Sequence, residues 1–169
     1  MKKLTGIILC GAMMLASKAF AAAPQVIGEY GDWTAYYYKE GKNSVCYMVS
    51  TPKKDEGKYS KRGNIYAVVT HRPAEKSFDV VNFDAGYVFK SGAPFTVKIG
   101  HNTVSSFFTE QGKAWTLNEE TDKKMVSLMK NGERMIVDGV SAKGNPTKDT
   151  YSLKGFTGAY KAISAKCRR

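Results

Sequence analysis

Cysteine and histidine are the side chains best suited to covalent or metal chemistry, and this chain has few of them. Its 169 residues include three Cys and two His. Cys46 and Cys167 form no CxxC pair and have no histidine beside them in sequence, so the pattern does not favour a catalytic thiol. His71 and His101 are isolated, whereas a zinc site needs several convergent ligands. We therefore predict no metal ion and no cofactor.

Motifs for nucleophilic, phosphate-binding and glycosidase chemistry are not evident either. The sequence has no G-x-S-x-G, P-loop or G-x-G-x-x-G motif. Glycoside hydrolysis needs two opposed carboxylates, and only tertiary structure could pair Asp79, Asp84, Glu110 or Asp138. We predict that the protein is not an enzyme. The alternative is a small periplasmic hydrolase whose site is assembled only in three dimensions.

A basic segment between residues 52 and 63 is the main candidate for binding. Its cations form a candidate anion-binding patch: Lys53, Lys54, Lys58, Lys61 and Arg62. Excess positive charge attracts anionic partners over long distances. The expected partners are anionic molecules of the cell envelope or of a host surface, because export makes nucleic acid a poor candidate. The alternative for this segment is a solvated loop without a ligand.

The N-terminus has the three parts of an export signal. Lys2 and Lys3 precede an apolar stretch over residues 4–16, and residues 19–21 (Ala-Phe-Ala) form a small-x-small cleavage site. We predict a signal peptide over residues 1–21 and a single mature domain over 22–169. The signal removes three of the 26 basic residues and none of the 15 acids, so 23 and 15 remain, a net charge of +8. No later apolar stretch is long enough to cross a membrane. The predicted location is the periplasm or the medium.

Signal removal also changes the cysteine count. Cys10 leaves with the signal, and Cys46 and Cys167 remain. In an oxidising compartment a remaining pair most simply forms one disulfide. Two free buried thiols are the alternative.

The mature chain has the pattern of an antiparallel sandwich or barrel. Turn signals recur every eight to twelve residues between strand-prone segments. The predicted strands cover residues 33–38, 44–51, 64–71, 77–83, 87–89, 95–99, 103–109, 114–117, 134–142 and 147–154, with a further short strand within 22–32.

Two segments have helical rather than strand patterns. Asn118 can cap a helix over residues 119–131, and acidic residues lie in its first turn. Residues 157–166 form a second short helix. Phe156, Tyr160, Ile163 and Cys167 share one face at helical spacing and would dock this helix on the sheet.

Several short motifs along the mature chain together resemble one protein family. They are Gly31-Asp32-Trp33, Val45-Cys46, Pro52-Lys53, Arg62-Gly63, residues 72–75 (Arg-Pro-Ala-Glu), Ala114-Trp115, residues 129–132 (Met-Lys-Asn-Gly), residues 141–144 (Ser-Ala-Lys-Gly), residues 149–156 (Asp-Thr-Tyr-Ser-Leu-Lys-Gly-Phe), Ala159 and Cys167. The chain resembles the invasion-associated locus B family of exported α-proteobacterial proteins. The block over 149–156, with the following Ala159 and Cys167, is the most specific part.

This resemblance implies a fold, a location and a role. It implies an all-β, immunoglobulin-like antiparallel sandwich, an envelope or secreted location and, as in some pathogenic members, a link to host-cell entry. The motif residues are expected to be structural: Trp33, Trp115, Asp149, Tyr151, Leu153, Gly155 and Phe156. We expect an exported, non-enzymatic envelope protein that acts by binding, and keep a purely structural envelope protein as the third possibility.

Overall fold

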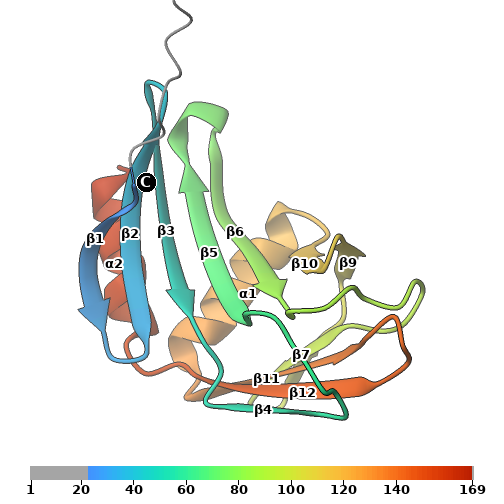
Figure 1. Ribbon diagram of the computed structural model, residues 1–169. Coiled ribbons are helices and arrows are strands. Elements are labelled where there is room, and N and C mark those ends of the chain that lie inside the picture. The colour runs from blue at the N-terminus through green and yellow to red at the C-terminus, as the bar shows by residue number, and fades with distance from the viewer. Residues whose placement is uncertain (1–22, 169) are drawn as a thin grey trace, which may run out of the picture.

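The protein is a two-sheet antiparallel β-structure with two α-helices (Figure 1). A computed structural model describes residues 23–168, so the predicted signal peptide lies outside the described residues. The strands are β1 (Gln25–Tyr30), β2 (Trp33–Glu40), β3 (Asn43–Ser50), β4 (Lys54–Gly57), β5 (Tyr66–Arg72), β6 (Ser77–Asp84), β7 (Thr96–Ile99), β8 (Asn102–Val104), β9 (Phe107–Glu110), β10 (Lys113–Thr116), β11 (Arg134–Val140) and β12 (Pro146–Ser152). The helices are α1 (Glu119–Asn131) and α2 (Phe156–Lys166). This confirms the expected all-β sandwich with two helices.

The larger sheet has seven strands in the order β1-β2-β3-β5-β6-β10-β9. The strands predicted at residues 33–38 and 44–51 pair in it as the antiparallel β2–β3 hairpin, with Tyr37 opposite Cys46. Alternate residues of β2 and β3 are buried, which is the period-two pattern of a sheet with one face toward a core.

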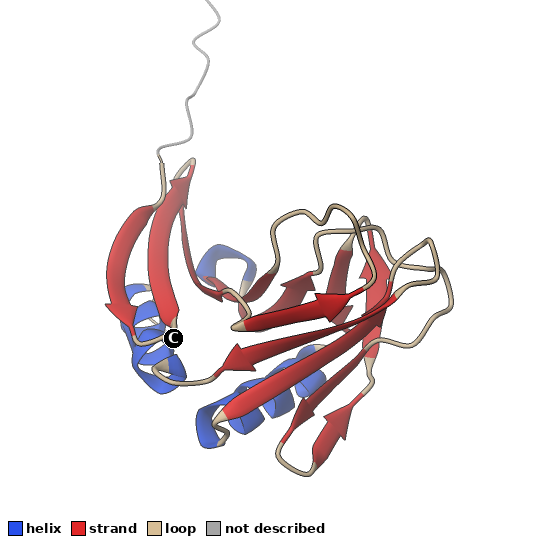
Figure 2. Ribbon diagram, turned by 60° about the horizontal axis from the view of Figure 1, so that its bottom comes forward, coloured by secondary structure: helices blue, strands red, loops and turns tan. Residues whose placement is uncertain are grey.

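The smaller sheet has five strands in the order β4-β12-β11-β7-β8. It lies along the bottom of the molecule in Figure 1 and comes forward in Figure 2. Its β11–β12 hairpin pairs Val137 with Asp149, and β4 then pairs Asp55 with Asp149 from the other side.

Both α-helices contribute to one continuous core. Asn118 caps α1 by accepting a hydrogen bond from the backbone N–H of Thr121 at 2.9 Å, as its side-chain type predicts. Met125 and Met129 of α1 and Ile163 of α2 pack into the same apolar cluster as the inner residues of both sheets. Figure 2 shows the two helices in blue beside the strands.

The structure differs from the predicted strand list in three places. Residues 54–57 are an edge strand, where the sequence predicted only loop. Residues 87–89 form no strand, and Phe89 makes an isolated bridge to Ser141. The predicted strand 103–109 is divided between β8 and β9, which belong to different sheets. Each difference depends on pairing with a distant strand, which local patterning does not specify.

Candidate functional site

Three chain segments that are distant in sequence meet at one end of the smaller sheet. They are the β4–β5 connection, the loop that follows β6 and the β11–β12 turn, all at the right of Figure 1. Backbone hydrogen bonds hold them together: the Gly63 N–H donates to the Gly86 carbonyl at 2.9 Å, and the Ala142 N–H donates to the Val88 carbonyl at 2.7 Å. They enclose a pocket of about 420 Å³, within the usual range for small-molecule sites.

Arg62 forms the floor of this pocket through a buried ion pair. Its two terminal nitrogens donate to the two carboxylate oxygens of Asp149 at 2.7 and 2.5 Å, and its Nε–H donates to the Ala85 carbonyl at 2.7 Å. Both charged side chains are only 3% exposed. Burial by itself lowers the pKa of Arg62, but hydrogen bonds with Asp149 and Tyr59 outweigh it and hold this pKa above its ordinary value. The floor is therefore a neutral pair.

Two tyrosines form the walls and enclose the guanidinium. The Arg62 carbon Cζ lies 5.2 Å from the ring centre of Tyr59 and 5.1 Å from that of Tyr87, within cation–π distance. The Tyr87 hydroxyl contacts the Thr147 hydroxyl at 2.6 Å, and burial raises the Tyr87 pKa. A hydrogen bond to Asp55 raises the Tyr59 pKa. Both walls are thus uncharged at neutral pH.

Lysines surround the opening of this pocket. Lys58 and Lys61 come from the β4–β5 connection, and Lys143 comes from the β11–β12 turn. All three are exposed, and among residues 23–168 no carboxylate lies within 4 Å of their ammonium groups. No residue lining the pocket is acidic. We call this site the lysine-rimmed pocket.

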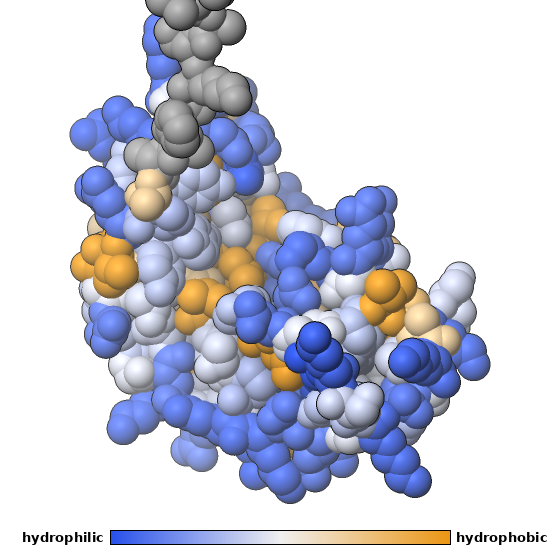
Figure 3. Space-filling view, in the orientation of Figure 1, coloured by the Kyte–Doolittle hydropathy of each residue, from blue (hydrophilic) through white to orange (hydrophobic). Residues whose placement is uncertain are grey.

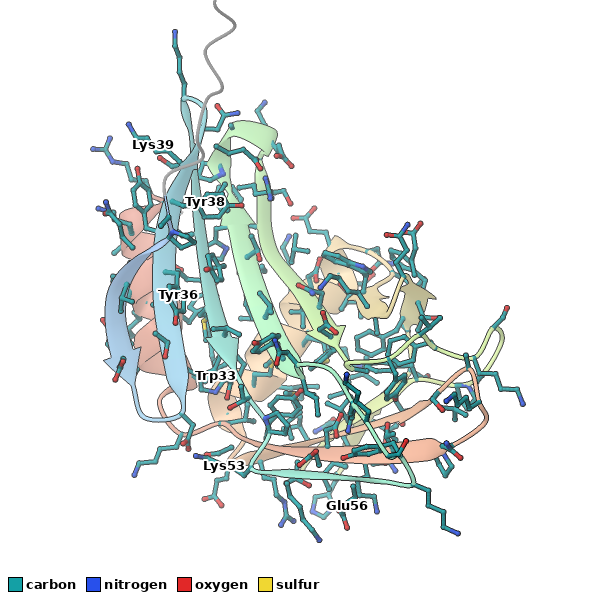
Figure 4. The ribbon with its side chains drawn as sticks, in the orientation of Figure 1. Trp33, Tyr36, Tyr38, Lys39, Lys53 and Glu56 are labelled. Carbon is teal, nitrogen blue, oxygen red and sulfur yellow. A yellow bond between two sulfur atoms is a disulfide. The ribbon has the colours of Figure 1, made fainter. Side chains whose placement is uncertain are left out.

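The anion-binding patch predicted from sequence is thereby divided. Lys58 and Lys61 line the pocket as free cations, but Lys53 pairs with Asp32, and Lys54 pairs with Glu56 at 2.9 Å. Figure 4 shows Lys53 and Glu56 along the lower edge of the molecule.

Arg62 is not the exposed cation that the sequence predicted. Its charge is satisfied by Asp149 inside the protein, so it acts as a structural support. Sequence reasoning also missed Lys143. The antiparallel β4–β12 pairing, with Thr147 opposite Gly57, brings its turn to Lys58, and no local signal encodes this contact.

A second, larger groove lies on the smaller sheet near the end of α1. It has a volume of about 950 Å³ and is lined by Lys53, Lys98, His101, Arg134 and Glu133 among others. Its charges are largely compensated, since Lys53 pairs with Asp32 and Lys98 pairs with Asp138 at 2.8 Å. Figure 3 shows the hydrophilic side chains along this lower part of the molecule.

Most family-motif residues stabilise the fold around α2. Trp33 is buried, donates to the Ser152 carbonyl at 3.1 Å and packs edge-on against Phe156 at 5.0 Å. Tyr151 and Leu153 are buried in the same core. Gly155 has a φ of +89°, and a Cβ there would overlap the Tyr30 carbonyl. These side chains thus lie in the core around α2, where the structural role predicted for them stays a prediction.

Trp115 is the exception among these residues, because it lies outside the buried core. Its strand neighbours Ala114 and Thr116 are buried, whereas Trp115 is only partly buried. Alternation along β10 therefore directs its indole to the outer face of the larger sheet, opposite the helices.

The predicted disulfide is present. Cys46 of β3 and Cys167 at the end of α2 are bonded, with their Cα atoms 6.0 Å apart. The bond links the larger sheet to the last helix. All four residues of the predicted docking face, which are Phe156, Tyr160, Ile163 and Cys167, are buried.

A partly buried serine–histidine pair lies near this disulfide. Ser164 Oγ and His71 Nε2 are 3.2 Å apart, and the backbone N–H of Asp79 donates to His71 Nδ1 at 3.1 Å. Nδ1 therefore carries no proton, so Nε2–H donates to the serine. A hydrolase triad requires the opposite arrangement, in which Nε2 accepts the serine proton. The imidazole is also fully buried, so this pair serves to join α2 to β5.

Within residues 23–168, no group of three or more His, Cys, Asp or Glu side chains could hold a metal ion. In the same part of the chain, no helix combines the length and apolar character that crossing a bilayer requires.

Comparison with known proteins identifies one family. A family model described as "Invasion associated locus B (IalB) protein" matches residues 33–164, which include both walls, the floor and all three lysines of the pocket. No curated protein sequence and no solved structure gives a significant match. Because the match covers most of the chain, the protein belongs to the invasion associated locus B family.

Proposed function

We propose that this protein is exported and acts without catalysis, by binding anionic molecules of the cell envelope or of a host surface. The mature chain begins at Ala22 in this proposal and works in the periplasm or outside the cell. The disulfide supports export, because such bonds persist in oxidising compartments.

One observation carries the proposal. The lysine-rimmed pocket presents Lys58, Lys61 and Lys143 without a carboxylate among its lining residues. The other three basic side chains of the predicted patch, Lys53, Lys54 and Arg62, are each paired with an acid. Positive charge without a local counter-charge attracts anions most strongly when little salt screens it.

A role in contact with host cells is a more specific proposal than anion binding. The family description refers to invasion, and host surfaces carry acidic glycans and anionic lipids. An exported cationic protein can meet such surfaces if it reaches the outside of the cell. Recovery of the oxidised protein from the medium, as well as from the periplasm, would support this more specific proposal.

The test of anion binding uses residues 22–169 with the disulfide intact. Vesicles of phosphatidylglycerol and phosphatidylcholine should sediment with the protein at about 20 mM salt, and binding should weaken strongly near 500 mM, where the Debye length falls to a few ångströms. Vesicles of phosphatidylcholine alone should not bind. Equal binding to both vesicle types, or none to either at low salt, would refute the proposal and favour a purely structural envelope role.

A further inference from the structure

The lysine-rimmed pocket has features that a surface acting only through charge would not need. Its three lysines come from two segments that are distant in sequence and line one pocket, whose floor is already a neutral ion pair. Arg62 has its charge compensated by Asp149, so the floor contributes rigidity and little net attraction. Fixed surroundings lower the entropy cost of ordering a ligand. This preorganisation points to one small, defined ligand.

The three lysines specify an anionic group on that ligand. Ammonium groups donate up to three hydrogen bonds each, and charge-assisted bonds to phosphate or carboxylate are about twice as strong as neutral ones. A carboxylate in the lining would oppose such binding, and the lining has none. The nearest acids, Asp149 and Asp55, are hydrogen-bonded to Arg62 and Tyr59.

The rest of the lining specifies a ring with both apolar and hydroxylated edges. Tyr59, Tyr87 and Val88 supply apolar surface, and Val88 is 64% exposed. Ser60, Ser141 and Asn145 add hydroxyl and amide groups to the same lining. A bare inorganic anion would not use the apolar wall. A lipid chain would need a deeper channel lined by apolar side chains, whereas this pocket also presents hydroxyl and amide groups.

We propose that the lysine-rimmed pocket binds an anionic saccharide, that is, a sugar ring that carries a phosphate or a carboxylate. The anionic group would contact Lys58, Lys61 and Lys143, and the ring would lie against Tyr59, Tyr87 and Val88. This inference rests on the proposed binding of anions and names its ligand class and site.

The experiment is an NMR titration of the ¹⁵N-labelled, oxidised protein (residues 22–169) with four probes. Glucose 6-phosphate and glucuronic acid distinguish a phosphate from a carboxylate, and glucose and inorganic phosphate test the ring and the anion separately. We expect saturable shifts of the amides at residues 58–61, 87–88 and 141–145 with at least one anionic sugar. Glucose and inorganic phosphate should each bind about tenfold more weakly or worse, because each lacks one set of contacts.

Two variants and one matched control make the assignment specific. The triple variant Lys58→Gln, Lys61→Gln, Lys143→Gln should weaken binding of the anionic sugar by about tenfold or more. Val88→Glu adds a carboxylate at an exposed position and should do the same without disturbing the core. The control Lys39→Gln, Lys42→Gln, Lys161→Gln removes the same charge from exposed lysines elsewhere and should bind normally. Figure 4 shows Lys39 at the opposite end of the molecule from β4.

Several outcomes would overturn the inference. Equal binding of inorganic phosphate and the anionic sugars would reduce the site to a simple anion site. Shifts spread over the whole surface, an equal loss in the control variant, or no saturable binding would remove the pocket as a site. If anionic vesicles bind the protein at low salt while no anionic sugar gives saturable shifts at the pocket, the proposed function stands and this assignment fails, so the two failures are distinguishable.

Discussion

Arg62 and Asp149 form a two-point ion pair across 87 residues of sequence, and both side chains are almost completely buried. This contact joins the β4–β5 connection to β12. It explains why Arg62, although it lies in a basic loop, is unavailable to a ligand. The pair also holds both tyrosine walls of the lysine-rimmed pocket in place through its cation–π contacts.

Removal of Arg62 should destabilise the protein strongly. Arg62→Gln leaves the Asp149 carboxylate buried without its cation, and such a loss typically costs about 3–5 kcal/mol. Urea unfolding at pH 7, followed by tryptophan fluorescence, measures the change in free energy of unfolding. A loss below about 1 kcal/mol would contradict the buried pair.

A double-mutant cycle separates the pair from its surroundings. In Arg62→Gln with Asp149→Asn, neither partner leaves an uncompensated charge, so the double variant should lose clearly less stability than the sum of the two single losses. Additive losses would show that the two side chains act independently.

Removal of the disulfide should destabilise the folded protein, because the unfolded chain gains conformational entropy when the bond no longer constrains it. The bond spans 121 residues, and the loop-entropy model sets a ceiling of roughly 4–5 kcal/mol for loops of this length. Cys46→Ser with Cys167→Ser should lower the urea midpoint. Intact mass without reductant should show a chain that begins at Ala22 and is two hydrogens lighter than the reduced form, and two free thiols in the oxidised protein would contradict the bond.

Asp32 provides a test of the Lys53 ion pair through pH. The hydrogen bond from Lys53 is the main cause that lowers the pKa of Asp32 below its ordinary value. A depressed pKa in the folded state contributes stability above the unfolded pKa, near 3.9, and this contribution is lost as the pH falls through the folded value. NMR titration of the Asp32 carboxyl should give a low pKa that rises toward the ordinary value in Lys53→Gln. An unchanged Asp32 pKa in this variant would contradict the ion pair between Lys53 and Asp32.

Two glycines with left-handed backbones provide a matched comparison. Gly155 and Gly144 have φ angles of +89° and +83°, but a Cβ at Gly155 would overlap the Tyr30 carbonyl, whereas nothing lies within 4 Å of one at Gly144. Gly144→Ala should cost about 1 kcal/mol from backbone strain alone. Gly155→Ala should cost clearly more, since the start of α2 must move away from β1. Equal thermal midpoints for the two variants would rule out the close approach.

The fold class, both helices and a disulfide as the simplest state of the two remaining cysteines could be predicted from the amino-acid sequence alone. These features arise from local signals: the Asn118 cap and acidic first turn of α1, the spacing of Phe156, Tyr160 and Ile163, and the remaining cysteine pair. Periodicity and capping act over a few residues, so they can be recognised without knowledge of the distant chain.

Which basic side chains are unpaired depends on contacts between distant parts of the chain. Lys53, Lys58 and Arg62 belong to the same basic segment, yet the first pairs with Asp32, the second remains exposed and the third is buried against Asp149. Lys143 joins Lys58 because β4 pairs with β12. The Arg62–Asp149 ion pair joins residues 87 positions apart, and β4 pairs with β12 through residues such as Lys54 and Thr150 that are still further apart in sequence. The amino-acid composition gives the net charge but does not show which charged side chains are paired.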